Sequence, residues 1–270
     1  MSTVARMPAA RRAGRARNLY GALPIVAAAL GDKFGVKVIV AGNQFMTDGS
    51  RITVPAIDLD DESFKDVMIG GVSHEGAHIR FTDFNVWYAA AGTNPVRRSM
   101  LNVVEDVRIE LALADDYPGT RQTIAKMFEF YRQKGEIKAV TEQDHPATIL
   151  VNYALHRLRA QHLGQRCFAD LAELGEAVVR KVYPAGAVVR LHALFAEVPN
   201  LESTRDALEL VDLVLAMLKE EEEKARQPPQ PQQGEQDGQD DPDQGASQQG
   251  GSASGSDDGA QDAGGDARLV

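Results

Sequence analysis

Residues 73–81 read Ser-His-Glu-Gly-Ala-His-Ile-Arg-Phe, and this stretch decides how the rest of the sequence is interpreted. His74 and His78 are four residues apart, so on a helix both imidazoles project from one face and can bind one cation. Glu75 lies about 100° around the helix from His74, where its carboxylate can take a proton from a water that the metal activates. Imidazole nitrogen suits Zn²⁺, which lowers the pKa of such a water to about 7. We therefore predict a zinc site with Glu75 as its general base.

Apolar residues around this motif recur at helical spacing and predict a helix over residues 63–80. They form one stripe with the two histidines, which consists of Phe64, Val67, Gly71, His74, His78 and Phe81. Both histidines should therefore face the interior of the protein. The alternative to a metal site is a pair of core histidines that are hydrogen-bonded to the backbone.

A catalytic zinc site needs a third protein ligand, which should come from a second helix packed against the first. The best candidate segment is residues 101–110, where Glu105 and Asp106 stand in an otherwise apolar turn. We predict Glu105 as the third ligand, with Asp106 as the alternative. Asp106 or Glu110 would then hold the second nitrogen of a histidine and set its tautomer. Without a metal, these acids would form an ion pair with Arg108 on a solvated face.

The rest of the sequence predicts an α+β fold that is predominantly helical. Strands are expected at residues 36–40 and 52–54, with turn residues at 47–50 between them, as in a small sheet or hairpin. Further helices are expected at residues 97–114, 120–134, 146–162, 166–181, 185–197 and 203–224. The small β region thus precedes the motif helix, and a helical C-terminal part follows it.

An amphipathic first helix is expected from apolar residues at helical spacing, namely Leu23, Val26, Leu30 and Phe34. Pro24 suits the first turn of such a helix. A signal peptide is the alternative, because arginines precede the apolar stretch at residues 23–30. No run approaches the ~20 apolar residues that cross a bilayer, so no membrane span is expected. The single cysteine, Cys167, excludes an internal disulfide and favours a cytoplasmic setting.

The net charge of −10 is unevenly distributed along the 270 residues. Residues 1–17 carry five arginines and no acid, and we expect a basic disordered arm there. Residues 227–270 are rich in Gln, Gly, Ser and Asp and hold almost nothing apolar, so we expect a disordered acidic tail. One folded domain is then expected at residues 18–226. The arm has no stacking aromatic residue, and nucleic-acid binding is not expected.

Together these segments resemble the metallopeptidase-like domains of the gluzincin type that precede von Willebrand factor A domains. Many of these domains are labelled cobaltochelatase-subunit-like in bacteria and bacteriophages. The resemblance is strongest over residues 45–110, and it rests on three segments with a weaker fourth, at residues 47–55, 73–84, 101–110 and 203–208.

The resemblance implies a zincin-like domain with His74, His78 and Glu105 as zinc ligands and Glu75 as the base. It also implies a strand beside the active-site cleft, matched by residues 52–55. A MoxR-type AAA+ ATPase and a von Willebrand factor A domain protein are the implied partners. No Asp-x-Ser-x-Ser motif of an A domain follows a strand in this sequence, so that domain is expected on a separate polypeptide, or the protein works without it.

Three hypotheses for the function follow. The first is a zinc peptidase that hydrolyses a protein or peptide substrate, and the intact base Glu75 favours it. The second is a non-proteolytic, metal-binding accessory subunit of a cobaltochelatase-like assembly. The third is a structural or interaction protein. The sequence does not assign the residue that would stabilise an oxyanion; the downstream candidates are Tyr117, His145, Tyr153 and His156.

Overall fold

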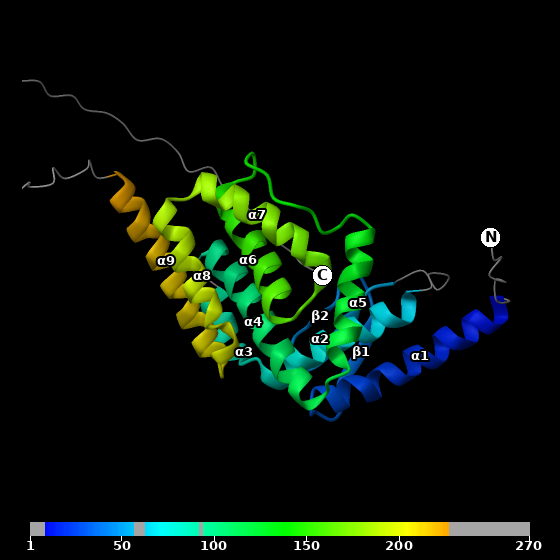
Figure 1. The fold of residues 1–270 in the computed structure, drawn as a ribbon. Helices are drawn as coiled ribbons and strands as arrows, with labels where there is room; N and C mark the ends of the chain where they lie inside the picture. Colours follow the sequence, from blue (N-terminus) through cyan, green and yellow to red (C-terminus); the bar gives the residue numbers. More distant parts are fainter. Residues whose placement is uncertain (1–8, 57–62, 92–93, 227–270) are drawn as a thin grey trace, which may run out of the picture.

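The computed structural model describes residues 9–56, 63–91 and 94–226 as a predominantly helical α+β fold with one small sheet (Figure 1). This confirms the predicted fold class. In chain order the elements of the described part are α1 (Ala9–Leu30), β1 (Lys37–Val40), β2 (Met46–Thr47), β3 (Arg51–Val54), α2 (Phe64–Phe81), α3 (Phe84–Ala91), α4 (Pro95–Asp116), α5 (Thr120–Gln133), α6 (Pro146–His162), η1 (Arg166–Phe168), α7 (Ala169–Val182), α8 (Ala185–Ala196), η2 (Val198–Asn200) and α9 (Thr204–Arg226). The expected acidic tail at residues 227–270 lies outside the described residues.

Three short strands form the sheet in the order β1-β3-β2. β1 pairs with β3 in parallel, whereas β2 pairs with β3 antiparallel. The turn expected between the two predicted strands instead joins β2, which the sequence analysis does not predict, to β3. In this turn the Asp48 carboxylate accepts hydrogen bonds from the backbone amides of Ser50 and Arg51, and Gly49 adopts a φ of 84°. β3 then packs against α2 and supports the helix that carries the motif.

Helix α2 is buried along most of its length because two glycines let other parts of the chain approach its backbone. A Cβ atom on Gly70 would lie 2.5 Å from the carbonyl oxygen of Thr123 in α5. A Cβ atom on Gly71 would lie 2.3 Å from the ring of Phe45, just before β2. Both distances are far shorter than a van der Waals contact allows. The glycines therefore fix α2 between α5 and the β region.

Helix α4 lies against α2 on one side and against α6 and α9 on others. It begins where the sequence supplies an N-cap, because the Asn94 side chain accepts hydrogen bonds from the amides of Val96 and Arg97. Pro95 occupies the first helical position, where its missing N–H has no intrahelical partner to lose. The helix is longer than the predicted 97–114 and remains buried over most of residues 100–110.

The C-terminal helices agree with the predicted segments to within a few residues. α8 and α9 lie on the side of the molecule opposite α1 in Figure 1, and α9 packs against α3, α4 and α8. Helix α3 is not predicted from the sequence. Its eight residues are mostly apolar and carry no polar face that would reveal helical periodicity.

Helix α1 differs from its prediction at both ends. It begins at Ala9, so residues 9–17 of the expected disordered arm are helical, while residues 1–8 lie outside the described part. Pro24 is inside the helix rather than in its first turn. The helix ends at Leu30, and the positive φ of Asp32 and of Gly35 turns the chain toward β1. Phe34, expected on the buried stripe, is therefore fully exposed.

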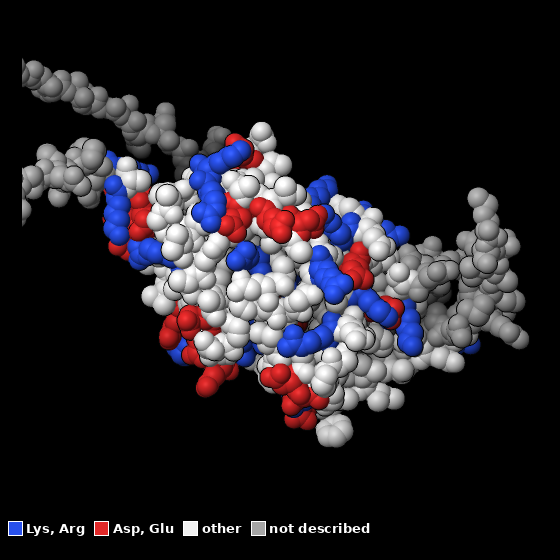
Figure 2. Space-filling view, in the orientation of Figure 1, with Lys and Arg blue, Asp and Glu red and all other residues white. Residues whose placement is uncertain are grey.

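The surface of the described part mixes charges of both signs. In the face shown in Figure 2, basic and acidic side chains are interspersed among uncharged ones, and neither sign forms a broad continuous patch among the described residues there. None of the described helices has both the length and the apolar character needed to cross a membrane.

Candidate metal centre

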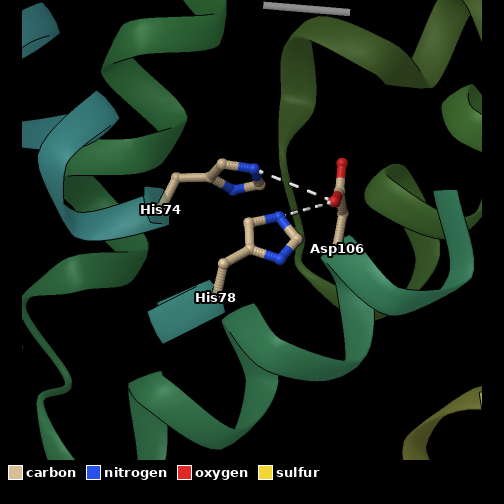
Figure 3. Close-up of side chains that lie close together, drawn as sticks. All are labelled: His74, His78 and Asp106. Carbon is tan, nitrogen blue, oxygen red and sulfur yellow. Dashed lines mark ion pairs between the residues drawn. The ribbon is translucent and has the colours of Figure 1, made fainter. Parts of the chain in front are cut away.

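Three side chains from two helices converge where α2 faces α4. Nε2 of His78 lies 3.2 Å from Oδ1 of Asp106, and Nε2 of His74 lies 3.8 Å from the same oxygen (Figure 3). The three ligand atoms lie within 4.8 Å of one another, close enough to bind one ion. The side chains are nearly buried, with exposed fractions of 11% for His74, 12% for His78 and 5% for Asp106. The two histidines predicted on one face of a helix are thus joined by one carboxylate from α4.

The two carboxylate oxygens of Asp106 have different surroundings. Oδ2 accepts hydrogen bonds from Arg159 at 3.3 Å and from Asn102 at 3.4 Å. Oδ1 is buried and accepts no hydrogen bond from any described residue, and its short contact with His78 is an ion pair without hydrogen-bond geometry. A buried carboxylate oxygen without a donor costs free energy unless a cation binds it. Oδ1 is therefore fit to be a metal ligand.

The second nitrogen of each histidine is held by another side chain. Nδ1 of His74 lies 2.9 Å from Oε1 of Glu110, and Nδ1 of His78 lies 3.0 Å from Oγ1 of Thr82. Burial raises the pKa of Glu110, but Arg159 and His74 outweigh this and lower it, so the ionised carboxylate only accepts hydrogen bonds. Nδ1 of His74 must then carry a proton. Glu110 thus makes the contact expected of a residue that sets a histidine tautomer.

A buried arginine joins the acids of α4 to α6. Arg159 is 1% exposed, and its guanidinium donates to Oε1 of Glu110 at 2.8 Å as well as to Asp106. It also lies over the ring of Phe128 at 4.0 Å, and Gln165 donates to the other oxygen of Glu110 at 3.0 Å. The sequence does not predict Arg159 or Gln165 as part of the centre. They lie about fifty residues from α4 in the chain, and nothing in the local pattern separates them from ordinary surface residues.

The buried charges around this centre do not balance without a cation. Among the described residues around the centre, four carboxyl groups are buried, those of Glu75, Glu105, Asp106 and Glu110, against the two guanidinium groups of Arg108 and Arg159. With neutral histidines this leaves an excess of two negative charges when Glu75 is ionised and of one when it is protonated. A cation at the centre would offset this excess, and burial makes such an imbalance costly.

The pKa values of the group show the same excess of negative charge. Burial opposes the imidazolium form of His74, but Asp106, Glu110 and Glu75 outweigh it and raise its pKa to about 9. Burial likewise opposes ionisation of Asp106, but His74, His78 and Arg159 lower its pKa to about 2. A proton on His74 thus adds one positive charge to the centre, where a divalent metal ion would add two.

Glu105, predicted as the third ligand, has a different position. It is fully buried beside Asp106 in α4, but it is not part of the group of ligand atoms. Its oxygens accept hydrogen bonds from Thr82, Thr204 and Arg108, each at 2.8 Å. Three of these hydrogen bonds end on Oε1 and one on Oε2, so both oxygens have protein donors, unlike Oδ1 of Asp106. The geometry therefore favours Asp106, the alternative, over Glu105.

Glu75 lies between the two histidines in α2 and is 4% exposed. Burial raises the pKa of its carboxyl group, although the charges of His74 and His78 act in the opposite direction and Asp106 acts with burial. A raised pKa is the direction of shift that suits a carboxyl group acting as a general acid or base.

The four candidates for stabilising an oxyanion all have partners elsewhere. The Tyr117 hydroxyl donates to the carbonyl of Ala29, and His145 caps the start of α6. Tyr153 is hydrogen-bonded to a partner in α8, while His156 stacks on a ring of η1. None of these four contacts is to the histidine and aspartate group.

Comparison with known families adds an independent observation. The family described as "Cobalamin biosynthesis protein CobT" matches residues 15–268. The chain belongs to the CobT family. No curated protein and no solved structure matches the chain. The match supports the cobaltochelatase-like part of the resemblance seen in the sequence, while it carries no indication of peptidase activity.

Proposed function

We propose that this CobT family protein holds one divalent metal ion between His74, His78 and Asp106 and serves as a non-proteolytic, metal-binding subunit of a cobaltochelatase-type assembly. The observation that carries the metal site is the buried Asp106 oxygen without a hydrogen-bond donor, which faces Nε2 of both histidines. Membership of the CobT family supports the chelatase context.

The donor set indicates which ions the centre prefers. Two imidazole nitrogens and one carboxylate oxygen are donors that suit Zn²⁺. When bound, the ion would supply a Lewis acid that polarises an oxygen-containing ligand. Glu110 and Thr82 hold the outer nitrogens of the histidines, while Arg159 keeps Oδ2 of Asp106 turned away from them.

The partners of the proposed assembly are a MoxR-type AAA+ ATPase and a protein with a von Willebrand factor A domain. The resemblance of residues 45–110 to domains that work beside such proteins supports this choice, as does the CobT family match. In this arrangement the metal centre belongs to the subunit itself, and the ATPase supplies the energy for remodelling.

Metal analysis of the purified chain tests the proposal most simply. We expect about one Zn²⁺ per chain after expression in zinc-replete medium, and loss of the ion in His74→Ala and His78→Ala. His145→Ala, in a histidine outside the centre, is the matched control and should keep its zinc. In a cobalt-insertion assay with purified ATPase and A-domain subunits, His74→Ala should lose activity while His145→Ala keeps it. Wild-type protein that stays metal-free, or a His74→Ala variant with full activity, would contradict the proposal.

Peptidase activity is the second candidate, and the position and raised pKa of Glu75 favour it. If Glu75 is the general base, Glu75→Gln should retain zinc while hydrolysis of an unfolded protein falls by about 10²-fold or more. If the protein is a non-proteolytic subunit, zinc-loaded wild type and Glu75→Gln should show the same background hydrolysis. The assay is run with and without the ATPase, so that a peptidase that needs its partner is also detected.

A further inference from the structure

Glu105 is the centre of a second buried network, next to the metal centre but separate from it. Oε1 accepts hydrogen bonds from the hydroxyls of Thr82 and Thr204 and from the guanidinium of Arg108, all at 2.8 Å. Oε2 accepts a further bond from Arg108 at 2.8 Å. One carboxylate therefore meets one guanidinium and two hydroxyls, and this network carries no net charge.

The network determines the direction of the hydrogen bond to His78. Because a carboxylate only accepts, the Thr82 hydroxyl must give its single proton to Glu105. Thr82 then has only lone pairs left for Nδ1 of His78, so this nitrogen must carry the proton. Nε2 of His78 is left as the acceptor that faces Asp106, which is the tautomer a metal ligand needs.

The same network joins the end of α2 to the start of α9. Thr204, the first residue of α9, donates to Glu105 and accepts a hydrogen bond from the backbone amide of Asp83 at 2.8 Å. Arg108 adds bonds from its guanidinium to the carbonyls of Phe81 at 2.8 Å and Glu202 at 3.4 Å. Residues more than one hundred positions apart in the chain thus meet beside Thr82, which contacts Nδ1 of His78.

We propose that Thr82, Glu105 and Thr204 are positioning residues that fix the Nδ1-protonated tautomer of His78, and that α9 thereby contributes to metal affinity. The inference rests on the proposed function, because it concerns the same metal centre. Without the Thr82 acceptor, nothing holds the proton of His78 on Nδ1, and it moves to Nε2, which faces Oδ1 of Asp106 at 3.2 Å. A proton on Nε2 blocks the atom of His78 that would bind the metal.

Nuclear magnetic resonance of the ring nitrogens tests the tautomer in the metal-free protein, at a pH where the ring is neutral. We expect wild-type His78 to carry its proton on Nδ1 and Thr82→Val to carry it mainly on Nε2. Thr82→Ser keeps the hydroxyl and should restore the wild-type tautomer. A wild-type ring protonated on Nε2, or a Thr82→Val ring still protonated on Nδ1, overturns the proposal.

Metal affinity, measured by competition with a chromophoric chelator, is the second readout. We expect Thr82→Val to lower Zn²⁺ affinity about 10–100-fold, as for other outer-shell changes, and Thr204→Val to lower it by a smaller factor. Thr120→Val is the matched control for Thr204→Val, because Thr120, like Thr204, is the buried first residue of a helix, and its hydroxyl donates to a backbone carbonyl away from the centre. Equal affinity losses in Thr120→Val and Thr204→Val would show a purely structural effect and overturn the proposal.

The two readouts separate this inference from the proposed function. If wild-type protein binds no metal, the proposed function fails. The nuclear magnetic resonance measurement of the His78 tautomer still tests whether Thr82 fixes it. If wild type binds zinc and Thr82→Val binds it equally well, the metal centre stands and the positioning role fails.

Discussion

Two neighbouring acids of α4, Glu105 and Asp106, have opposite surroundings. Both carboxylate oxygens of Glu105 accept hydrogen bonds from protein donors, and its negative charge is paired with Arg108. Asp106 has one oxygen bound by donors and one buried oxygen without any. The difference makes Asp106 the better candidate ligand, because one of its buried oxygens has no hydrogen-bond donor, whereas burial and charge alone do not distinguish the two acids.

Glu105 and Asp106 should differ most in their contributions to folding stability. Glu105→Gln should cost about 3–5 kcal/mol of unfolding free energy, because it leaves the guanidinium of Arg108 buried without its carboxylate. Asp106→Asn should cost about 1 kcal/mol or less, since an amide oxygen can keep the bonds that Oδ2 accepts from Arg159 and Asn102. Urea unfolding of both metal-free variants well above pH 9, where His74 is neutral, measures the difference. Equal costs would remove the distinction between the two acids.

The pH dependence of folding stability reports on the negative charge of Asp106 through its effect on His74. The pKa of His74 is raised from 6.5 to about 9 in the folded chain, so protonated His74 stabilises the metal-free fold. This contribution, about 3 kcal/mol at most, is complete below pH 6.5 and is lost as the pH rises through 9.

Urea unfolding below pH 6.5 and above pH 9 measures this loss in the wild type. His74→Gln is the control and should lack this part of the pH dependence. In zinc-loaded protein the dependence should also disappear, because Nε2 of His74 is then occupied by the ion. A metal-free wild type with the same pH profile as His74→Gln would contradict the assigned environment of His74.

A smaller effect is expected where an acid acts on the centre through a histidine. Glu110→Ala removes the acceptor at Nδ1 of His74 and should lower Zn²⁺ affinity about 10–100-fold. The control is Asp66→Ala, because Asp66 also pairs with a basic side chain but lies at the exposed start of α2. Chelator competition measures both variants. An affinity loss in Asp66→Ala as large as in Glu110→Ala would mean that the assay reports general destabilisation.

Much of the candidate centre could be predicted from the sequence because its spacing is local. His74 and His78 share a helical face whatever surrounds them, and the position of acids on a second helix follows from the need for a third ligand. The choice between Glu105 and Asp106 could not be predicted. Adjacent residues point about 100° apart on a helix, and only the packing of α4 against α2 decides which of them faces the histidines.

The parts that the sequence analysis misses depend on long-range contacts. Arg159 and Thr204 reach the acids of α4 from α6 and α9, and their roles follow from where those helices dock rather than from neighbouring residues. The parallel pairing of β1 with β3 has a similar origin, because the intervening β2 takes the antiparallel position beside the turn. Local patterns thus predict the elements, and packing selects the partners.

Titration with Co²⁺ of wild type, Asp106→Asn and Glu105→Gln, each shown to be folded by circular dichroism, determines which acid of α4 is the third ligand. Visible absorption reports Co²⁺ bound by imidazole and carboxylate, and competition with Zn²⁺ gives the affinity. Wild type should bind about one ion per chain, and Glu105→Gln should still bind one with affinity reduced by no more than about 100-fold. Asp106→Asn should bind none at concentrations that saturate both. Stoichiometric binding by Asp106→Asn together with its loss in Glu105→Gln would contradict the assignment of Asp106 as the third ligand.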